Sequence, residues 1–117
     1  MSKIQVKVTL LTPDESYVDQ YNAIFHPDQN EITYKEKDDT KTKINTKELK
    51  LRRENEKLIM EYKFVENSTT VGKVFLKDFS KKIELKINTK KIKQNTNNLE
   101  IEYELENEIY KYKIEVL

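Results

Sequence analysis

Regular alternation of apolar and polar residues is the feature that most constrains the fold of this chain. Residues 3–10 read KIQVKVTL, in which every second side chain is aliphatic. A period of two indicates a β-strand with one buried face. The same pattern predicts strong strands over 58–64, 83–87, 99–105 and 110–116, and weaker ones over 21–26, 31–36, 40–45, 47–53 and 69–76. About ten short strands at roughly ten-residue spacing are typical of an all-β barrel or sandwich.

Asparagine and aspartate must build most turns between these strands, because the chain has one glycine, Gly72, and two prolines. Turn signals occur at Pro13-Asp14, Pro27-Asp28, Asp38-Asp39, Asn55, Asn67, Asp78, Asn97-Asn98 and Asn107. Asn and Asp tolerate the left-handed backbone conformation that tight turns require. Connections this short permit hairpins and leave no room for crossover helices. We therefore expect one domain over residues 1–117, a single antiparallel up-and-down β-barrel.

The segment 47–64 is ambiguous, because it is rich in residues that also favour helices. Leu51, Leu58 and Tyr62 could line one side of a helix. Apolar residues nevertheless alternate strictly on both sides of Asn55. We interpret the segment as two strands joined by a turn at Asn55.

Composition argues against most catalytic and cofactor chemistry. The chain has no cysteine, so it can form neither disulfides nor thiolate metal sites. One glycine cannot make a phosphate-binding loop. The only histidine, His26, is flanked by Phe25 and Pro27, and we interpret it as a turn residue. A histidine-based metal site would need a second imidazole, and no serine lies at a spacing that would pair it with His26 as a catalytic nucleophile. We expect a protein that is not an enzyme and uses neither cofactor nor metal.

Charge and hydropathy indicate the compartment and the partners. Twenty-two basic and 21 acidic residues give a net charge of +1, whereas dedicated nucleic-acid-binding domains are usually strongly basic. The N-terminus passes directly into the alternating pattern, and no stretch approaches 18 apolar residues. We expect a cytoplasmic protein, a monomer or homodimer, without a membrane partner.

Several segments together resemble the YwiB-like family, small bacterial proteins of unknown function with a calycin-type, lipocalin-like barrel. The segments are TKTKI (40–44) with LKLRR (49–53), FS (79–80) with IELKINTK (83–90), IEYEL (101–105) and YKIEV (112–116). Asn55 and Ser80 stand where the family often has glycine. The resemblance implies a calycin-like barrel and brings no established activity.

The most informative polar residues share the parity of the apolar faces. Arg53 keeps the parity of Leu49 and Leu51, and Thr42 keeps that of Ile44. The tyrosines that point inward on the same argument are Tyr62, Tyr103, Tyr110 and Tyr112. They can lie at the barrel mouths while Arg53 reaches outward to solvent. Alternatively, they line a wet cavity that binds a small amphipathic or anionic ligand, such as a carboxylate with a hydrophobic tail.

Two charged sets are predicted to point outward. The first is a basic hairpin, defined by Lys41, Lys43, Lys47, Lys50 and Arg52. It is either a solvated surface or a contact for RNA or a protein partner, although it lacks outward aromatic rings on which bases could stack. The second is a lysine–glutamate ladder, with Glu100, Glu102, Glu104 and Glu106 between Lys86 and Lys90 on one side and Lys111 and Lys113 on the other. We expect this ladder to fix strand register rather than to supply catalytic carboxylates.

Overall fold

Ten antiparallel strands close into one barrel in the computed structural model, which describes residues 1–117. The strands are β1 (Ser2–Leu11), β2 (Ser16–His26), β3 (Glu31–Lys35), β4 (Lys41–Asn45), β5 (Lys50–Glu54), β6 (Leu58–Lys63), β7 (Ser68–Leu76), β8 (Lys81–Gln94), β9 (Asn98–Leu105) and β10 (Glu108–Val116). Two three-residue 3-10 helices, Pro27–Gln29 and Lys77–Phe79, complete the elements, and none of the helices is long and apolar enough to cross a membrane. The all-β, up-and-down architecture predicted from the alternation is confirmed.

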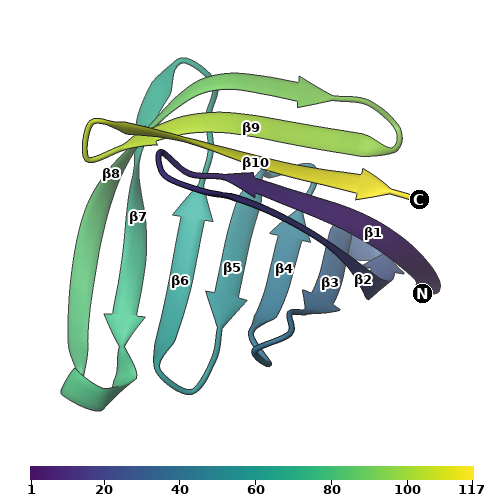
Figure 1. Ribbon diagram of the computed structural model, residues 1–117, viewed down its shortest axis with the longest axis horizontal. Helices are drawn as coiled ribbons and strands as arrows, with labels where there is room; N and C mark the ends of the chain where they lie inside the picture. Colours follow the sequence, from purple (N-terminus) through teal and green to yellow (C-terminus); the bar gives the residue numbers. More distant parts are fainter.

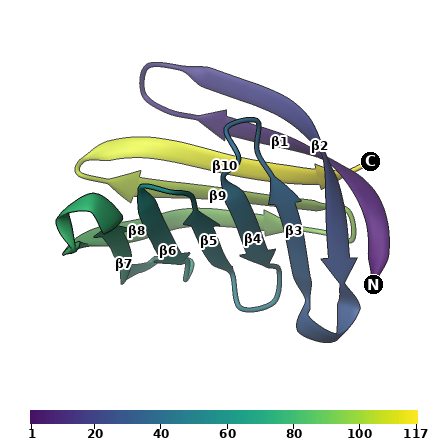
Figure 2. The same cartoon turned by 90° about the horizontal axis from the view of Figure 1, so that it is seen from below.

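Each strand pairs with its neighbours in sequence, and β1 closes the barrel by pairing with β10 as well as β2. The strands form two groups that cross at a steep angle: β1, β2, β9 and β10 run one way, and β3–β7 run across them (Figures 1 and 2). Two strands turn the corners between these groups. β2 pairs with β1 along most of its length and with β3 through its last residues, and β8 pairs first with β7 and then with β9.

The ambiguous segment 47–64 forms strands, as predicted, in β5 and β6 with a turn between them. The Asn55 side chain accepts hydrogen bonds from the N–H groups of Lys57 and Leu58, which closes this turn. Strand boundaries differ from the prediction most clearly at three places. β8 continues to Gln94 rather than ending near residue 87. β2 begins at Ser16 rather than near residue 21, and residues 47–49 belong to the preceding turn rather than to β5.

Asparagine and aspartate take the left-handed turn positions that glycine usually fills, as predicted. Asn30, Asp39, Asn67 and Asn107 all have φ between 53° and 67°. Leu49, Ser80 and Glu106 also have positive φ, and of these the sequence singles out only Ser80, as a position of glycine in the family that it resembles. Ser80, with φ of 46°, ends the second 3-10 helix in a left-handed conformation. Glycine adopts this conformation without the steric cost that serine incurs.

The lysine–glutamate ladder is confirmed on the β10 side and partly wrong on the β8 side. The opposed pairs are Glu100–Lys113 and Glu102–Lys111 across β9 and β10, and Lys93–Glu100 and Lys91–Glu102 across β8 and β9. Lys86 lies opposite Val71 instead. A bulge between Thr89 and Lys91 adds a residue to β8 and shifts the pairing beyond it.

The interior of the barrel differs between its two ends. Aliphatic residues and Phe64 fill the end where β1 begins, with Val6, Ile44, Ile87, Ile101 and Ile114 at most 2% exposed. The inward positions nearer the other end, where β1 ends, are largely occupied by tyrosines. The aliphatic end contains most of the fully buried core, and the tyrosine end contains the candidate site.

The single glycine is required by close packing rather than by a turn. A Cβ atom built on Gly72 would lie 2.6 Å from Cδ1 of Ile87 and 2.8 Å from Cδ1 of Tyr62. Both contacts are shorter than side chains tolerate in a packed interior. The ring of Tyr62 therefore occupies the space over β7 that any larger residue would need.

We expect the Gly72→Ala variant to lose about 1–3 kcal/mol of unfolding free energy, because the new methyl group must displace Tyr62 or Ile87. Urea denaturation measures this change. Val71→Ala is the matched control, since Val71 is exposed on the same strand and should change stability by less than about 0.5 kcal/mol. Equal losses in the two variants would contradict this packing role for Gly72.

Candidate ligand-binding cavity

A cavity of about 490 Å³ lies at the tyrosine end of the barrel, and all seven tyrosines of the chain line it. They are Tyr17, Tyr21, Tyr34, Tyr62, Tyr103, Tyr110 and Tyr112. They come from β2, β3, β6, β9 and β10, so the cavity wall is assembled from segments far apart in the sequence. Leucine, valine and methionine side chains complete the apolar part of the wall.

Every residue that the sequence predicted to line an internal ligand site lies at this cavity. Arg53 lines the cavity with the four tyrosines that shared its predicted role. The sequence analysis missed two carboxylates there, Asp19 and Glu36. Glu36 keeps the parity of Ile32 and Tyr34, so alternation could have found it. Asp19 was missed because the predicted strand began after it.

Arg53 forms a two-pronged ion pair with Glu36. Its Nε and Nη2 atoms each donate a hydrogen bond of 2.9 Å to a different carboxylate oxygen of Glu36. The hydroxyl of Thr42, a fully buried residue, donates a third at 2.6 Å. Burial lowers the pKa of Arg53, but the hydrogen bond and charge of Glu36 raise it by more. The guanidinium is therefore a charged group whose charge is largely balanced within the cavity.

This pairing changes the chemistry expected of the site. The sequence suggested an arginine fork free to hold an anionic head group. A carboxylate ligand would now have to compete with Glu36, which binds Arg53 in the bidentate geometry preferred for such pairs. The Nη1 group of Arg53 makes no hydrogen bond within the protein and stays available for a neutral acceptor.

Two tyrosine pairs are stacked along the wall of the cavity. The rings of Tyr21 and Tyr34 lie 5.1 Å apart, and those of Tyr103 and Tyr110 lie 5.6 Å apart. The hydroxyls of Tyr34 and Tyr112 share a buried hydrogen bond of 2.8 Å. Burial raises the pKa values of Tyr34, Tyr103 and Tyr112, so these phenols stay protonated at neutral pH.

Two buried phenols have no partner in the protein. Tyr62 is 7% exposed and Tyr103 is 6% exposed, yet neither hydroxyl makes a hydrogen bond within the chain. The buried side-chain polar atoms that are sealed from solvent without a partner are the hydroxyls of Thr33 and Thr89. The hydroxyls of Tyr62 and Tyr103 therefore remain in contact with the cavity, where water or a ligand can satisfy them.

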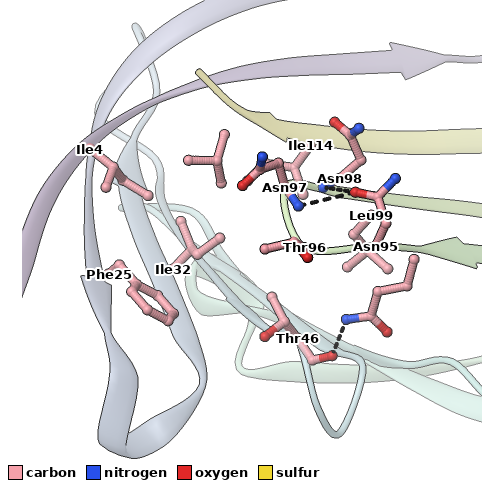
Figure 3. A pocket seen from close by; sticks show the side chains of 12 residues that line it. Ile4, Phe25, Ile32, Thr46, Asn95, Thr96, Asn97, Asn98, Leu99 and Ile114 are labelled. Atoms are coloured by element: carbon pink, nitrogen blue, oxygen red, sulfur yellow. Dashed lines mark hydrogen bonds between the residues drawn. The ribbon is translucent and has the colours of Figure 1, made fainter.

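A second, smaller cavity of about 290 Å³ lies at the opposite end. In Figure 3 its apolar residues, including Ile4, Phe25 and Ile32, face the turn Asn95–Asn98 between β8 and β9. The Asn95 side chain accepts hydrogen bonds from the N–H groups of Asn97 and Asn98, which fixes this turn. None of the predicted site residues lines this cavity, and we take the larger one as the candidate site.

The basic hairpin forms part of the outer surface. Lys41 and Lys43 lie on β4, Lys50 and Arg52 on β5, and Lys47 in the turn between them. Carboxylates form ion pairs with two of its cations. The Arg52 side chain lies 3.0 Å from that of Glu54, and the Lys50 side chain lies 3.3 Å from that of Glu48. A role in binding RNA or a protein stays a prediction.

We expect Arg53→Met to lower the unfolding free energy by about 1–3 kcal/mol, because it leaves the largely buried carboxylate of Glu36 without its cation. Arg52→Met is the matched control, because Arg52 is the next residue and points to solvent. Its surface pairs should contribute less than about 1 kcal/mol. Urea denaturation of both variants tests the difference, and a larger loss from Arg52→Met would show that the inner pair is unimportant.

We expect stability to fall as the pH rises above about 10. The unfolded phenols release protons near pH 10, whereas burial raises the pKa values of Tyr34, Tyr103 and Tyr112 in the folded state. The stabilising contribution is complete below the unfolded pKa and is lost as the pH rises towards the folded values. Urea midpoints measured between about pH 8 and pH 11 should show this decline, with a shallower slope in Tyr112→Phe. An identical slope in that variant would contradict the assignment.

No family model matches this chain, and no curated protein matches it in sequence. Its structure is similar to the crystal structure of the ywiB protein from Bacillus subtilis, with a TM-score of 0.64 and 19% sequence identity. The match covers 96% of this chain and 87% of that one. This likeness shows that the chain has a YwiB-like barrel fold, as the sequence resemblance implied.

Proposed function

We propose that this protein is a non-catalytic binding module that holds a small amphipathic ligand in the tyrosine-lined cavity. One observation carries the proposal: all seven tyrosines of the chain line this cavity, and the hydroxyls of two buried tyrosines, Tyr62 and Tyr103, make no hydrogen bond within the protein. A closed core of this size could have been filled with leucine and phenylalanine. Buried tyrosine hydroxyls normally find a hydrogen-bond partner, and a ligand inside the barrel would provide one.

Size and lining support a small organic ligand. Pockets that bind such molecules have volumes of about 300–1,000 Å³ and combine apolar walls with a few polar groups. The cavity of about 490 Å³ lies in this range, and twelve of its fifteen lining residues are hydrophobic or aromatic. Barrels of similar strand number hold single small ligands in the same way.

The polar groups favour binding over catalysis. The only histidine, His26, ends β2 at the far end of the barrel from the cavity, so no imidazole base serves the site. Arg53 and Glu36 neutralise each other, and the phenols remain protonated donors. Such groups orient a polar head by hydrogen bonding, while the apolar wall covers a hydrocarbon tail.

Tyrosine fluorescence offers a direct test, because the chain has no tryptophan and every tyrosine lines the cavity. Titration with n-octanol, a neutral amphipathic ligand, should change the tyrosine emission and saturate at one molecule per chain. Native mass spectrometry of freshly purified protein should also reveal a bound small molecule. The absence of both a saturable response and a bound mass would contradict the proposal.

Filling the cavity should abolish binding. Met60 lines the cavity, whereas its neighbour Ile59 lies on the outer face of β6. We expect Met60→Trp to weaken n-octanol binding at least about tenfold, a difference of roughly 1.4 kcal/mol, because the indole ring takes the ligand's space. Ile59→Trp should leave the affinity unchanged, and calorimetry on both folded variants measures the difference. Equal affinities would place the ligand elsewhere.

A further inference from the structure

The balance of charge within the cavity is negative. Two carboxylates, Asp19 and Glu36, line it together with one cation, Arg53. Arg53 is committed to Glu36 through two hydrogen bonds. Asp19 accepts a hydrogen bond of 3.4 Å from the hydroxyl of Tyr21, and its cation is Lys37, whose Nζ lies 2.8 Å away on a side chain that is 78% exposed. A pair of this kind contributes little, because water competes for both partners.

The tyrosine rings also favour a positively charged ligand. The face of a tyrosine ring carries partial negative charge and attracts ammonium groups within about 6 Å of its centre. Two stacked pairs, Tyr21–Tyr34 and Tyr103–Tyr110, form part of the wall on β2–β3 and β9–β10. Several rings around one space resemble the aromatic cages that bind quaternary ammonium groups.

Carboxylates in and around the cavity raise the pKa values of Tyr21 and Tyr110. Burial raises the pKa of Tyr21, and Asp19, Glu36 and Asp38 raise it further. Burial also raises the pKa of Tyr110, with further contributions from acidic groups in the β1–β2 and β9–β10 hairpins. Arg53 is the charged group that lowers the pKa values of the deeper phenols, those of Tyr34, Tyr62, Tyr103 and Tyr112. The charged groups that act on Tyr21 and Tyr110 are therefore carboxylates.

We infer that the ligand of this cavity is a small organic cation, an alkylated ammonium group carried on an apolar tail. The ammonium group lies against the tyrosine faces near Asp19, and the tail covers the aliphatic wall formed by Val8, Leu105 and Met60. This inference rests on the proposed function, since it requires that the cavity bind a ligand at all. It differs from the anionic ligand that the sequence suggested, because Glu36 already occupies the arginine fork.

Three ligands with the same tail separate the two claims: n-octyltrimethylammonium, n-octanol and n-octanoate. We expect octyltrimethylammonium to bind at least about fivefold more tightly than octanol, as desolvated cation–aromatic contacts allow, and octanoate to bind most weakly. Calorimetry at low salt, followed by tyrosine emission, measures the three affinities. If octanol binds and the ammonium compound binds no better, or octanoate binds best, this inference is wrong and the proposed function stands. If none of the three binds, both are wrong.

Variants of the charged groups test the position of the ammonium group. Asp19→Asn should weaken octyltrimethylammonium binding about two- to fivefold, the range of a partly exposed ion pair, and leave octanol binding unchanged. Asp28→Asn is the control, because Asp28 is an exposed carboxylate at the opposite end of the barrel.

A gain of affinity excludes misfolding as the explanation. Lys37→Met removes the cation that competes for Asp19, so it should tighten octyltrimethylammonium binding without affecting octanol. Unchanged ammonium affinity in both Asp19→Asn and Lys37→Met would overturn the inference. Equal effects of Asp19→Asn and Asp28→Asn would do so as well, because they would show only a long-range effect of net charge.

Discussion

Closure of the sheet by β1 is the constraint on which the rest of the structure depends. Because β1 pairs with both β2 and β10, no strand edge is left to bind another chain, and every second side chain must face a common interior. The aliphatic end of the barrel fills its share of that interior. The other end is lined instead by seven phenols and three charged side chains. A closed ten-stranded sheet thus encloses a packed core and a cavity at each end, and the residues at each end decide how large and how polar that cavity is.

The ion pair of Arg53 and Glu36 then defines the chemistry of the cavity. A buried arginine without a partner would be costly. Glu36 supplies that partner from the adjoining loop, and the hydroxyl of Thr42 on β4 donates a hydrogen bond to the same carboxylate. Once the pair has formed, the remaining polar character comes from phenols and from Asp19. These groups suit an amphipathic molecule, and their charge favours a cationic head. The structural likeness to the ywiB protein concerns the barrel alone and leaves these side chains to decide the function.

The sequence predicted which side chains face the interior of the barrel, but it did not predict which of them contact one another. Strict alternation correctly placed Arg53, Tyr62 and Tyr103 inside and separated β5 from β6. It could not show that Glu36 reaches Arg53 across β4, because that contact depends on the register of β4 with both β3 and β5. The bulge at Thr89 left no signal in the alternation of neighbouring residues, and it moved the ladder from Lys86 to Lys91 and Lys93. Asn55 and Asn107 formed turns as expected. Leu49 and Glu106 also lie in turns with positive φ, but leucine and glutamate have no preference for the left-handed conformation, so the sequence could not indicate it.

Selective labelling of the aromatic rings tests the central claim most directly, because the tyrosine rings and the ring of Phe25 line cavities at opposite ends of the barrel. All seven tyrosines line the proposed site, while Phe25 lines the cavity at the opposite end. Ring signals recorded by NMR during titration with an amphipathic ligand distinguish the two cavities. The account predicts saturable shifts of the tyrosine rings and an unchanged Phe25 signal. Shifts of Phe25 with unchanged tyrosine rings would place the ligand in the other cavity and contradict it.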